Sequence, residues 1–187
     1  AHRRLRDHLG LERLRLAGHS LGGMSGPRYA LRFPERVFSL GLYSTAAGRT
    51  EDDSAKVWTV VKAMEQKGIE KVLGTLTNRW FTDEFINRNP DIVERRLKQV
   101  MATDPDIFMN VFRIYAGTEM MPWLHEVTHP ALIITGELDG GCNPRLNTLI
   151  GEAMSSSKLI VLKGLKHSIL VEAGETVARH QIEFVHG

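Results

Sequence analysis

The residues best suited to chemistry in this sequence stand together at Gly18-His19-Ser20-Leu21-Gly22, which fits the pattern G-x-S-x-G. The pattern is typical of a serine nucleophile when a strand precedes it and a helix follows, because the glycines let the backbone turn sharply and leave the hydroxyl exposed. The helix would also direct free amide groups at the same point. We therefore predict Ser20 as a nucleophile and the Leu21 N–H as an oxyanion donor. The alternative is a glycine-rich turn with a solvated serine.

A serine hydroxyl attacks effectively only when a base takes its proton and a third group holds that base in one tautomer. Asp139 and His167 follow Ser20 in the order nucleophile, acid, base. Each comes after an apolar run that we predict to be a strand, so in a parallel sheet all three would lie at the same edge. Glu137 is the main rival for the acid, but it stands nearer the strand end and has less loop to reach His167. The sequence thus predicts a triad of Ser20, Asp139 and His167.

The seven other histidines are weaker candidates for the base. His19 is next to Ser20 in the chain, but neighbouring side chains diverge on a sharp turn. We predict His19 to be a structural or pocket-wall residue close to the substrate. The remaining six are expected on the surface or in packing contacts: His2, His8, His125, His129, His180 and His186.

The elements that must position these residues alternate in type at both ends of the chain. Short apolar runs predict strands over 14–17, 37–43, 131–135 and 159–163. Helical patterns predict helices over 2–9, 21–32, 143–154 and 171–185. Strands that alternate with helices form parallel βαβ units, so the sequence predicts an α/β fold with a mostly parallel sheet.

The character changes between residues 50 and 124, where only helical patterns occur. Helices are predicted over 52–67, 91–103 and 104–115, each opened by an acidic residue. We predict that residues 50–124 form a helical cap inserted into a core made of residues 1–49 and 125–187.

A cap over a serine site must present some apolar surface to the pocket. Most of its aromatic and methionine side chains are expected to form the core of the cap itself. Trp58, Trp80 and Phe81 are predicted to contact the substrate.

Charge and hydropathy exclude several classes of partner. The 24 basic and 22 acidic residues nearly cancel, so no strong field of one sign favours nucleic acid or an anionic membrane. No stretch approaches the roughly 18 consecutive apolar residues of a membrane-spanning helix, and the N-terminus lacks the apolar block of a secretory signal. We expect a soluble, cytoplasmic protein that acts on a small molecule.

The single Cys142 excludes an internal disulfide framework and a multi-cysteine zinc cage. The sequence contains no HExxH motif, no glycine-rich phosphate loop and no cluster of ligands along the chain. We therefore predict no metal site and no cofactor.

Several segments together resemble the α/β-hydrolase superfamily, and within it the capped esterases and the group similar to 3-oxoadipate enol-lactonase. These segments are LAGHSLGGM around Ser20, FPERV from Phe33, STAA from Ser44, RWFT from Arg79, ATDP from Ala102, PALIITGELDGG up to Gly141 and KHSILVEA around His167. Dehalogenases and epoxide hydrolases of this superfamily have Asp where this chain has Ser20. The resemblance therefore implies an esterase or lactonase.

The resemblance also shows a departure at the N-terminus. Relatives have several strands before the point where this chain begins, and the loop after one of them carries the second oxyanion amide. Without them, the nucleophile strand would expose an open sheet edge. We expect a truncated chain, or a homodimer in which a second copy covers that edge. A smaller departure is Gly174, where relatives commonly have Pro.

The predicted function is serine-dependent hydrolysis of carboxylic esters through an acyl-enzyme on Ser20. Opening of an enol-lactone or another lactone uses the same residues and is the first alternative. The second is a binding protein with the same fold and impaired catalysis.

Overall fold

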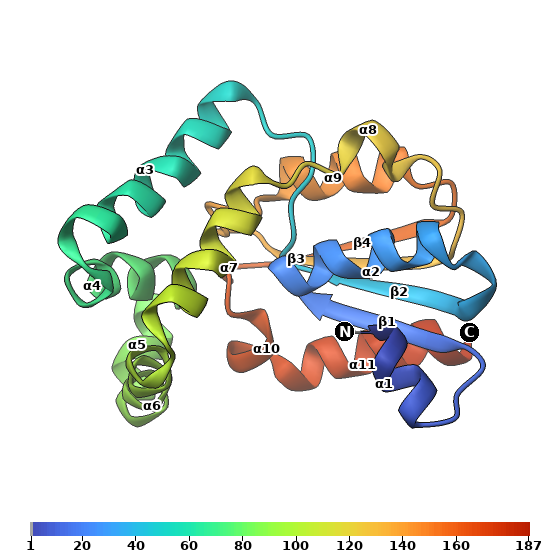
Figure 1. Ribbon diagram of the computed structural model, residues 1–187. Helices are drawn as coiled ribbons and strands as arrows, with labels where there is room; N and C mark the ends of the chain where they lie inside the picture. The colour runs from blue at the N-terminus through green and yellow to red at the C-terminus, as the bar shows by residue number, and fades with distance from the viewer. Residues whose placement is uncertain (1) are drawn as a thin grey trace.

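The computed structural model describes residues 2–187, with side chains from Arg4 onward, and shows a parallel sheet between helices (Figure 1). The four strands are β1 (Leu14–His19), β2 (Val37–Tyr43), β3 (Ala131–Gly136) and β4 (Ser157–Leu162). They pair in parallel in the order β1-β2-β3-β4. The carboxyl ends of all four strands therefore lie at one edge, as predicted.

Helices cover both faces of this sheet (Figure 1). One face carries α2 (Leu21–Arg32), α8 (Met121–Leu124) and α9 (Pro144–Ala153), and the other carries α10 (Ile169–Glu172) and α11 (Gly174–His186). The remaining core elements are α1 (His2–His8) and a 3₁₀ turn at Pro34–Arg36.

β3 shows why the sheet is covered on both faces. Every residue of this strand is buried, as expected for an apolar run in the middle of a parallel sheet. Ile133 packs in the cluster that contains Leu40 and Ile150, whereas Ile134 packs in the cluster that contains Val177. Successive side chains of β3 thus contribute to two different hydrophobic cores.

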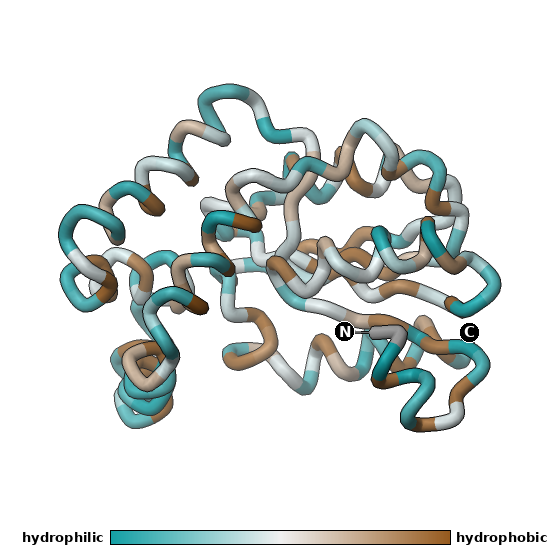
Figure 2. The backbone as a smooth tube through the Cα atoms, viewed as in Figure 1, coloured by the Kyte–Doolittle hydropathy of each residue, from teal (hydrophilic) through white to brown (hydrophobic). Residues whose placement is uncertain are grey.

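The cap helices lie beyond the carboxyl ends of the strands (Figure 1). They are α3 (Glu51–Lys67), α4 (Ile69–Trp80), α5 (Asp83–Arg88), α6 (Pro90–Ala102) and α7 (Pro105–Gly117). Hydrophobic and hydrophilic residues alternate along them (Figure 2), and their apolar faces form a third cluster around Val61, Leu76 and Phe108. The cap helices therefore have a hydrophobic core of their own.

The starts of the cap helices follow ordinary capping chemistry. Thr50 precedes α3, and its hydroxyl accepts a hydrogen bond from Asp53 N while the Asp53 carboxylate accepts from Thr50 N, which is a capping box. Asp104 caps α7 by accepting from the amides of Asp106 and Ile107. Acidic residues therefore do open these helices, although at α3 the cap residue itself is a threonine.

Glu119 joins the two connections between the cap helices and the sheet. Its carboxylate accepts hydrogen bonds from Gly48 N and Arg49 N, which follow β2, at 2.9 and 3.2 Å. It also accepts from Met120 N and Met121 N, which lead into α8, at 2.8 and 2.9 Å. Burial raises the pKa of Glu119, but the four amides outweigh burial and hold it below its ordinary value. One carboxylate thus holds the entrance and the exit of the cap together.

The structure differs from the predicted elements in several places. The predicted helix over 171–185 is two helices, α10 and α11, and β4 begins two residues before the predicted 159–163. Helices α4 and α5 were not predicted individually, and β1 continues two residues beyond the predicted 14–17. Met120 and Leu124 pack in the core cluster of the sheet, although they lie inside the predicted cap, 50–124. The domain division itself stays a prediction.

β1 lies at one edge of the sheet, and within residues 2–187 no strand pairs with its outer side. The homodimer that would cover this edge stays a prediction. Among the described helices, none combines the length and the apolar character needed to cross a membrane.

Candidate active site

Ser20 stands at the turn between β1 and α2 with a strained backbone. Its φ of 56° and ψ of −121° are uncommon for a residue with a side chain. A Cβ added to Gly18 would lie 2.2 Å from the Gly22 carbonyl oxygen, and one added to Gly23 would lie 2.8 Å from the Thr45 side chain. Close approach of neighbouring atoms therefore requires glycine at Gly18 and Gly23, whereas a Cβ at Gly22, the second glycine of the motif, would meet nothing within 4 Å.

The end of β2 holds this turn in place. Ser20 N donates a hydrogen bond to Tyr43 O at 2.8 Å, and the Thr45 hydroxyl donates to Ser20 O at 2.9 Å. Leu21 is the first residue of α2, and the first amides of a helix have no acceptor within the helix. The Leu21 N–H is thus available in the position predicted for an oxyanion donor.

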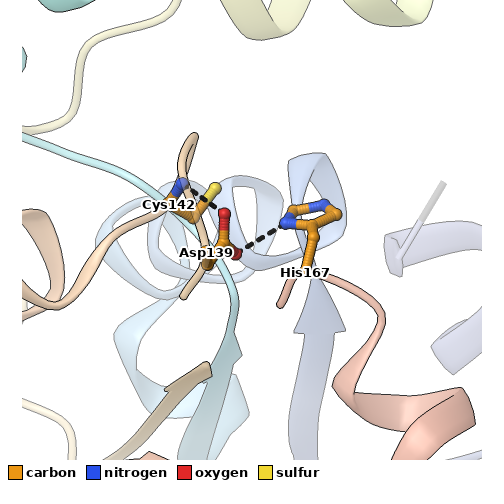
Figure 3. A group of neighbouring side chains, drawn as sticks. All are labelled: Asp139, Cys142 and His167. Carbon is orange, nitrogen blue, oxygen red and sulfur yellow. Dashed lines mark hydrogen bonds and ion pairs between the residues drawn. The ribbon is translucent and has the colours of Figure 1, made fainter. Parts of the chain in front are cut away.

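Asp139, and not Glu137, is bound to His167. The Asp139 Oδ2 atom lies 2.7 Å from His167 Nδ1, as drawn in Figure 3. Oδ1 of the same carboxylate accepts from Gly141 N at 3.0 Å and Cys142 N at 2.8 Å, and the residue is only 2% exposed. Glu137 is exposed and accepts from Gly164 N instead.

The electrostatics of this pair suit a base that gains positive charge during a reaction. Burial alone lowers the pKa of His167, but the hydrogen bond and charge of Asp139, together with the neighbouring Cys142 side chain, outweigh burial and raise it above its ordinary value. Burial raises the pKa of Asp139, but His167 and the two loop amides outweigh that effect and lower it. The carboxylate therefore stays ionised and favours an imidazolium beside it.

His19 lies against His167, with 4.7 Å between the ring centroids. Its Nε2 lies 2.8 Å from the His167 carbonyl oxygen. Because a carbonyl only accepts, Nε2 must carry the proton. Burial, and then the charge of His167, lower the pKa of His19 to about 4. His19 is therefore neutral near pH 7 and holds the backbone of His167.

A pocket of about 320 Å³ brings the predicted residues together. Its lining contains Ser20, Leu21, His19, Asp139 and His167 from the core, and it extends over the apolar side of the cap helices. Within residues 2–187, Ser20 and His167 share this pocket without a hydrogen bond between their side chains. Such bonds often tighten only when a substrate is bound. The volume suits a small organic ligand.

The three aromatic residues predicted to contact substrate occupy different places. Trp80 lines the pocket. Phe81 is fully buried, stacks on Phe85 with ring centroids 5.5 Å apart, and is not part of the lining. Trp58 is 37% exposed and also lies outside the lining. Contact of each with a substrate stays a prediction.

The pocket also contains polar residues that sequence reasoning missed. Arg79 and Arg96 are exposed side chains of the cap that line it, and the guanidinium of Arg96 lies 5.6 Å from the Trp80 ring. Tyr115 and Cys142 line its inner side, with the Tyr115 hydroxyl 3.2 Å from the Cys142 sulfur. Of these four residues, only Arg79 lies in a segment that carried the family resemblance, RWFT from Arg79 to Thr82.

The cap is fastened to the loop that carries His167. Ser168 N donates to Trp80 O at 2.8 Å. Two residues further along the cap, the amide and the hydroxyl of Thr82 both donate to the Glu172 carboxylate, at 3.2 and 2.5 Å. These hydrogen bonds therefore connect the end of α4, which carries Trp80, to the loop that carries His167.

Comparison with known proteins places the chain in a family. A family model described as serine aminopeptidase, S33, matches residues 2–174. The chain is 29% identical over 136 residues to 3-oxoadipate enol-lactonase 2 of Acinetobacter baylyi, covering 72% of this chain and 50% of that protein. It is 25% identical over 199 residues to a proline iminopeptidase of Clostridioides difficile, covering 91% and 65%.

Solved structures share the fold. The enol-lactonase from Burkholderia xenovorans LB400 has a TM-score of 0.89 at 22% identity, covering 98% of this chain and 69% of that one. A hydrolase from Pseudomonas aeruginosa PA01 has a TM-score of 0.87 at 25% identity, with coverage of 98% and 69%. The chain spans about half the length of the enol-lactonases it matches.

The matched residues reach from the first described helix into the last one, so the core and the cap are both included. The enol-lactonases among the relatives agree with the resemblance predicted from the motifs. The chain therefore belongs to the serine aminopeptidase, S33 family and has the α/β-hydrolase fold.

Proposed function

We propose that this protein hydrolyses small carboxylic esters or lactones through an acyl-enzyme on Ser20. The observation that carries the proposal is the 2.7 Å bond between Asp139 and His167 in the wall of the pocket that Ser20 also lines. The three residues stand after three different parallel strands, which is the arrangement of a nucleophile, base and acid.

In the proposed reaction, Ser20 Oγ attacks the carbonyl carbon of the substrate while His167 Nε2 takes the hydroxyl proton. The Leu21 N–H donates to the oxyanion that forms. Asp139 keeps Nδ1 protonated and favours the imidazolium. The imidazolium then gives its proton to the leaving alkoxide, and water cleaves the acyl-enzyme with His167 as the base again.

The charge of the pocket favours a substrate with a carboxylate over one with an amine. Arg79 and Arg96 line the pocket, whereas the single acidic residue in its described lining, Asp139, is already bound to His167. An aminopeptidase must accept a protonated amine, which two guanidinium groups would repel. An ester or lactone that carries a carboxylate would be attracted to the same groups.

Lactone opening is the more specific candidate within this proposal. Two relatives are named 3-oxoadipate enol-lactonase, and the chain covers about half of each. A lactone also suits a pocket of about 320 Å³ better than a long acyl chain would.

The test compares the wild-type protein and Ser20→Ala on a nitrophenyl ester and on an enol-lactone with a free carboxylate. We expect Ser20→Ala to lower kcat by at least about 10³-fold on both substrates, because the nucleophile is lost. Equal rates for the two proteins would show a binding protein without catalysis. A faster reaction on an aminoacyl anilide than on either ester would favour a peptidase.

A further inference from the structure

The thiol of Cys142 has no role in the proposed hydrolysis, yet it lies beside the acid and the base. The loop after β3 folds back so that Cys142 N donates to the Asp139 carboxylate at 2.8 Å. The Cys142 sulfur, a carboxylate oxygen of Asp139 and a ring nitrogen of His167 all lie within 4.8 Å of one another (Figure 3). Three different metal-ligating groups therefore meet at one point of the pocket wall.

The donor set has a definite chemical preference. A thiolate, an imidazole and a carboxylate together favour a borderline or soft divalent cation, such as Zn²⁺ or Cd²⁺, over Mg²⁺ or Ca²⁺. Tetrahedral zinc with ordinary bond lengths would hold such ligand atoms about 3.3–3.6 Å apart. Ligand atoms at the 4.8 Å limit would have to approach by about 1.2–1.5 Å, through rotation of the side chains.

The surroundings of the cluster would support a bound cation. The Tyr115 hydroxyl lies 3.2 Å from the Cys142 sulfur and can donate to a thiolate. The Gly141 and Cys142 amides hold the carboxylate of Asp139 in place. Such second contacts orient ligands and strengthen metal binding. Cys142 and Asp139 are 0% and 2% exposed, but both line the pocket with His167, so an ion would reach them through the pocket.

We propose that Asp139, Cys142 and His167 form an inhibitory binding site for Zn²⁺ or a similar soft divalent cation. On binding, Cys142 loses its thiol proton to solvent. The coordinating nitrogen of His167 gives up any proton it carries, to solvent or to the other ring nitrogen, and donates the lone pair to the metal. A coordinated His167 cannot accept the proton of Ser20, so hydrolysis stops until the metal is removed. The site departs from the prediction of no clustered ligands, because the loop fold, and not sequence spacing, brings Cys142 to His167.

The first test follows the absorbance of a cadmium–thiolate bond during titration of the protein with Cd²⁺. Cys142 is the single cysteine of the chain, so a charge-transfer band reports this thiol alone. We expect the band to saturate at one equivalent in the wild type and in Ser20→Ala, and to be absent in Cys142→Ala. Because Ser20→Ala is inactive under the proposed function, binding by this variant is independent of catalysis.

The second test measures Zn²⁺ affinity by calorimetry. We expect Cys142→Ala and His167→Ala each to weaken binding at least about 10-fold, and His125→Ala, an exposed histidine outside the pocket, to leave it unchanged. Cys142→Ser serves as a second variant if thermal denaturation shows that Cys142→Ala is poorly folded. Zn²⁺ should also lower esterase activity at least about 10-fold, with recovery after a chelator.

Three results would overturn the proposal. The first is a wild-type protein with no cadmium–thiolate band. The second is equal Zn²⁺ affinity in the wild type and in folded variants of Cys142. The third is a loss in His125→Ala as large as that in His167→Ala, which would place the metal elsewhere.

Discussion

The core and the cap hold their parts of the pocket in different ways. In the core, backbone hydrogen bonds fix the groups predicted to react: Ser20 by the end of β2, and Asp139 by two amides of its own loop. In the cap, the pocket wall consists of side chains from amphipathic helices whose shared cluster is separate from the core clusters. Under the proposed function, the core would determine the chemistry and the cap would determine which molecules reach it.

The two regions are aligned by two carboxylates, each shared between them. Glu119 joins the connections at the base of the cap, and Glu172 joins Thr82 to the loop of His167. Changes in the core should therefore alter kcat, whereas changes in the cap should alter KM. Changes at the two carboxylates should affect stability or both constants.

The largest effect is expected from Asp139→Asn in the core. We expect kcat to fall by about 10⁴-fold, because an amide can hold His167 in the wrong tautomer and does not favour the imidazolium. In the wild type the base form of His167 appears only above its raised pKa, so kcat/KM should rise with pH through an inflection above 6.5. Without the carboxylate, burial dominates and the inflection should move to lower pH. A pH–rate profile that is unchanged in the variant would contradict this assignment.

The next largest effect is expected from Glu119→Ala. Removal of the carboxylate leaves four backbone amides without their acceptor, which we expect to cost about 2 kcal/mol of unfolding free energy. Denaturant unfolding at pH 7 measures this loss.

The stabilisation that the Glu119 charge provides should depend on pH, and Glu119→Gln, which removes only the charge, measures this dependence. The pKa of Glu119 is lowered on folding, so its contribution is present above the ordinary value of 4.5 and is lost as pH falls through the folded value. The gap between the wild type and Glu119→Gln should therefore shrink below about pH 4.5. A constant gap from pH 7 to pH 3 would show that the charge of Glu119 has no role.

A smaller and more selective effect is expected from Arg96→Gln in the cap. KM for an ester with a free carboxylate should rise about 3–10-fold, a modest change because the side chain is exposed and screened. KM for a neutral ester of the same size should not change. Arg95→Gln is the matched control, since Arg95 is the exposed neighbour on α6 and lies outside the pocket lining. Equal effects of the two variants would remove Arg96 from substrate recognition.

The smallest effect is expected from Glu172→Gln. The amide keeps one acceptor oxygen for Thr82 but loses the charge, so we expect KM to rise about 2–5-fold as the cap is held less firmly. The pH inflection from His167 should stay in place, because Glu172 acts on the position of the loop. Glu175→Gln, an exposed change nearby, serves as the control. A shifted inflection would instead indicate a direct electrostatic role.

The core could be predicted from sequence because its signals are local. Each strand contains a short, mostly apolar run, and Ser20, Asp139 and His167 each follow such a run, so parallel topology places them at one edge. The sequence favoured Asp139 over Glu137 from the length of loop available, and the loop conformation that brings Asp139 within 2.7 Å of His167 is seen in the structure. The same loop brings Cys142 to His167, and no spacing rule describes that turn.

The cap was harder to predict because helix periodicity shows which residues share a face but not what the face meets. Trp58, Trp80 and Phe81 are all aromatic residues of the cap helices or their ends, yet of the three only Trp80 lines the pocket. Arg79 and Arg96 come from different helices, α4 and α6, and meet in the pocket lining through tertiary packing. Nothing in the linear sequence indicates that these two arginines line the same pocket.

The position of Glu119 has a consequence for how such proteins diversify. Because the polypeptide leaves the sheet at Gly48 and returns at Met120 beside a single carboxylate, the intervening helices start and finish at neighbouring points. Insertions whose ends lie close together can replace one another without a change in the scaffold. The entropy of closing the inserted loop grows only slowly with its length. Recombination would therefore be able to exchange the helices between Gly48 and Met120 while the strand order stays as it is.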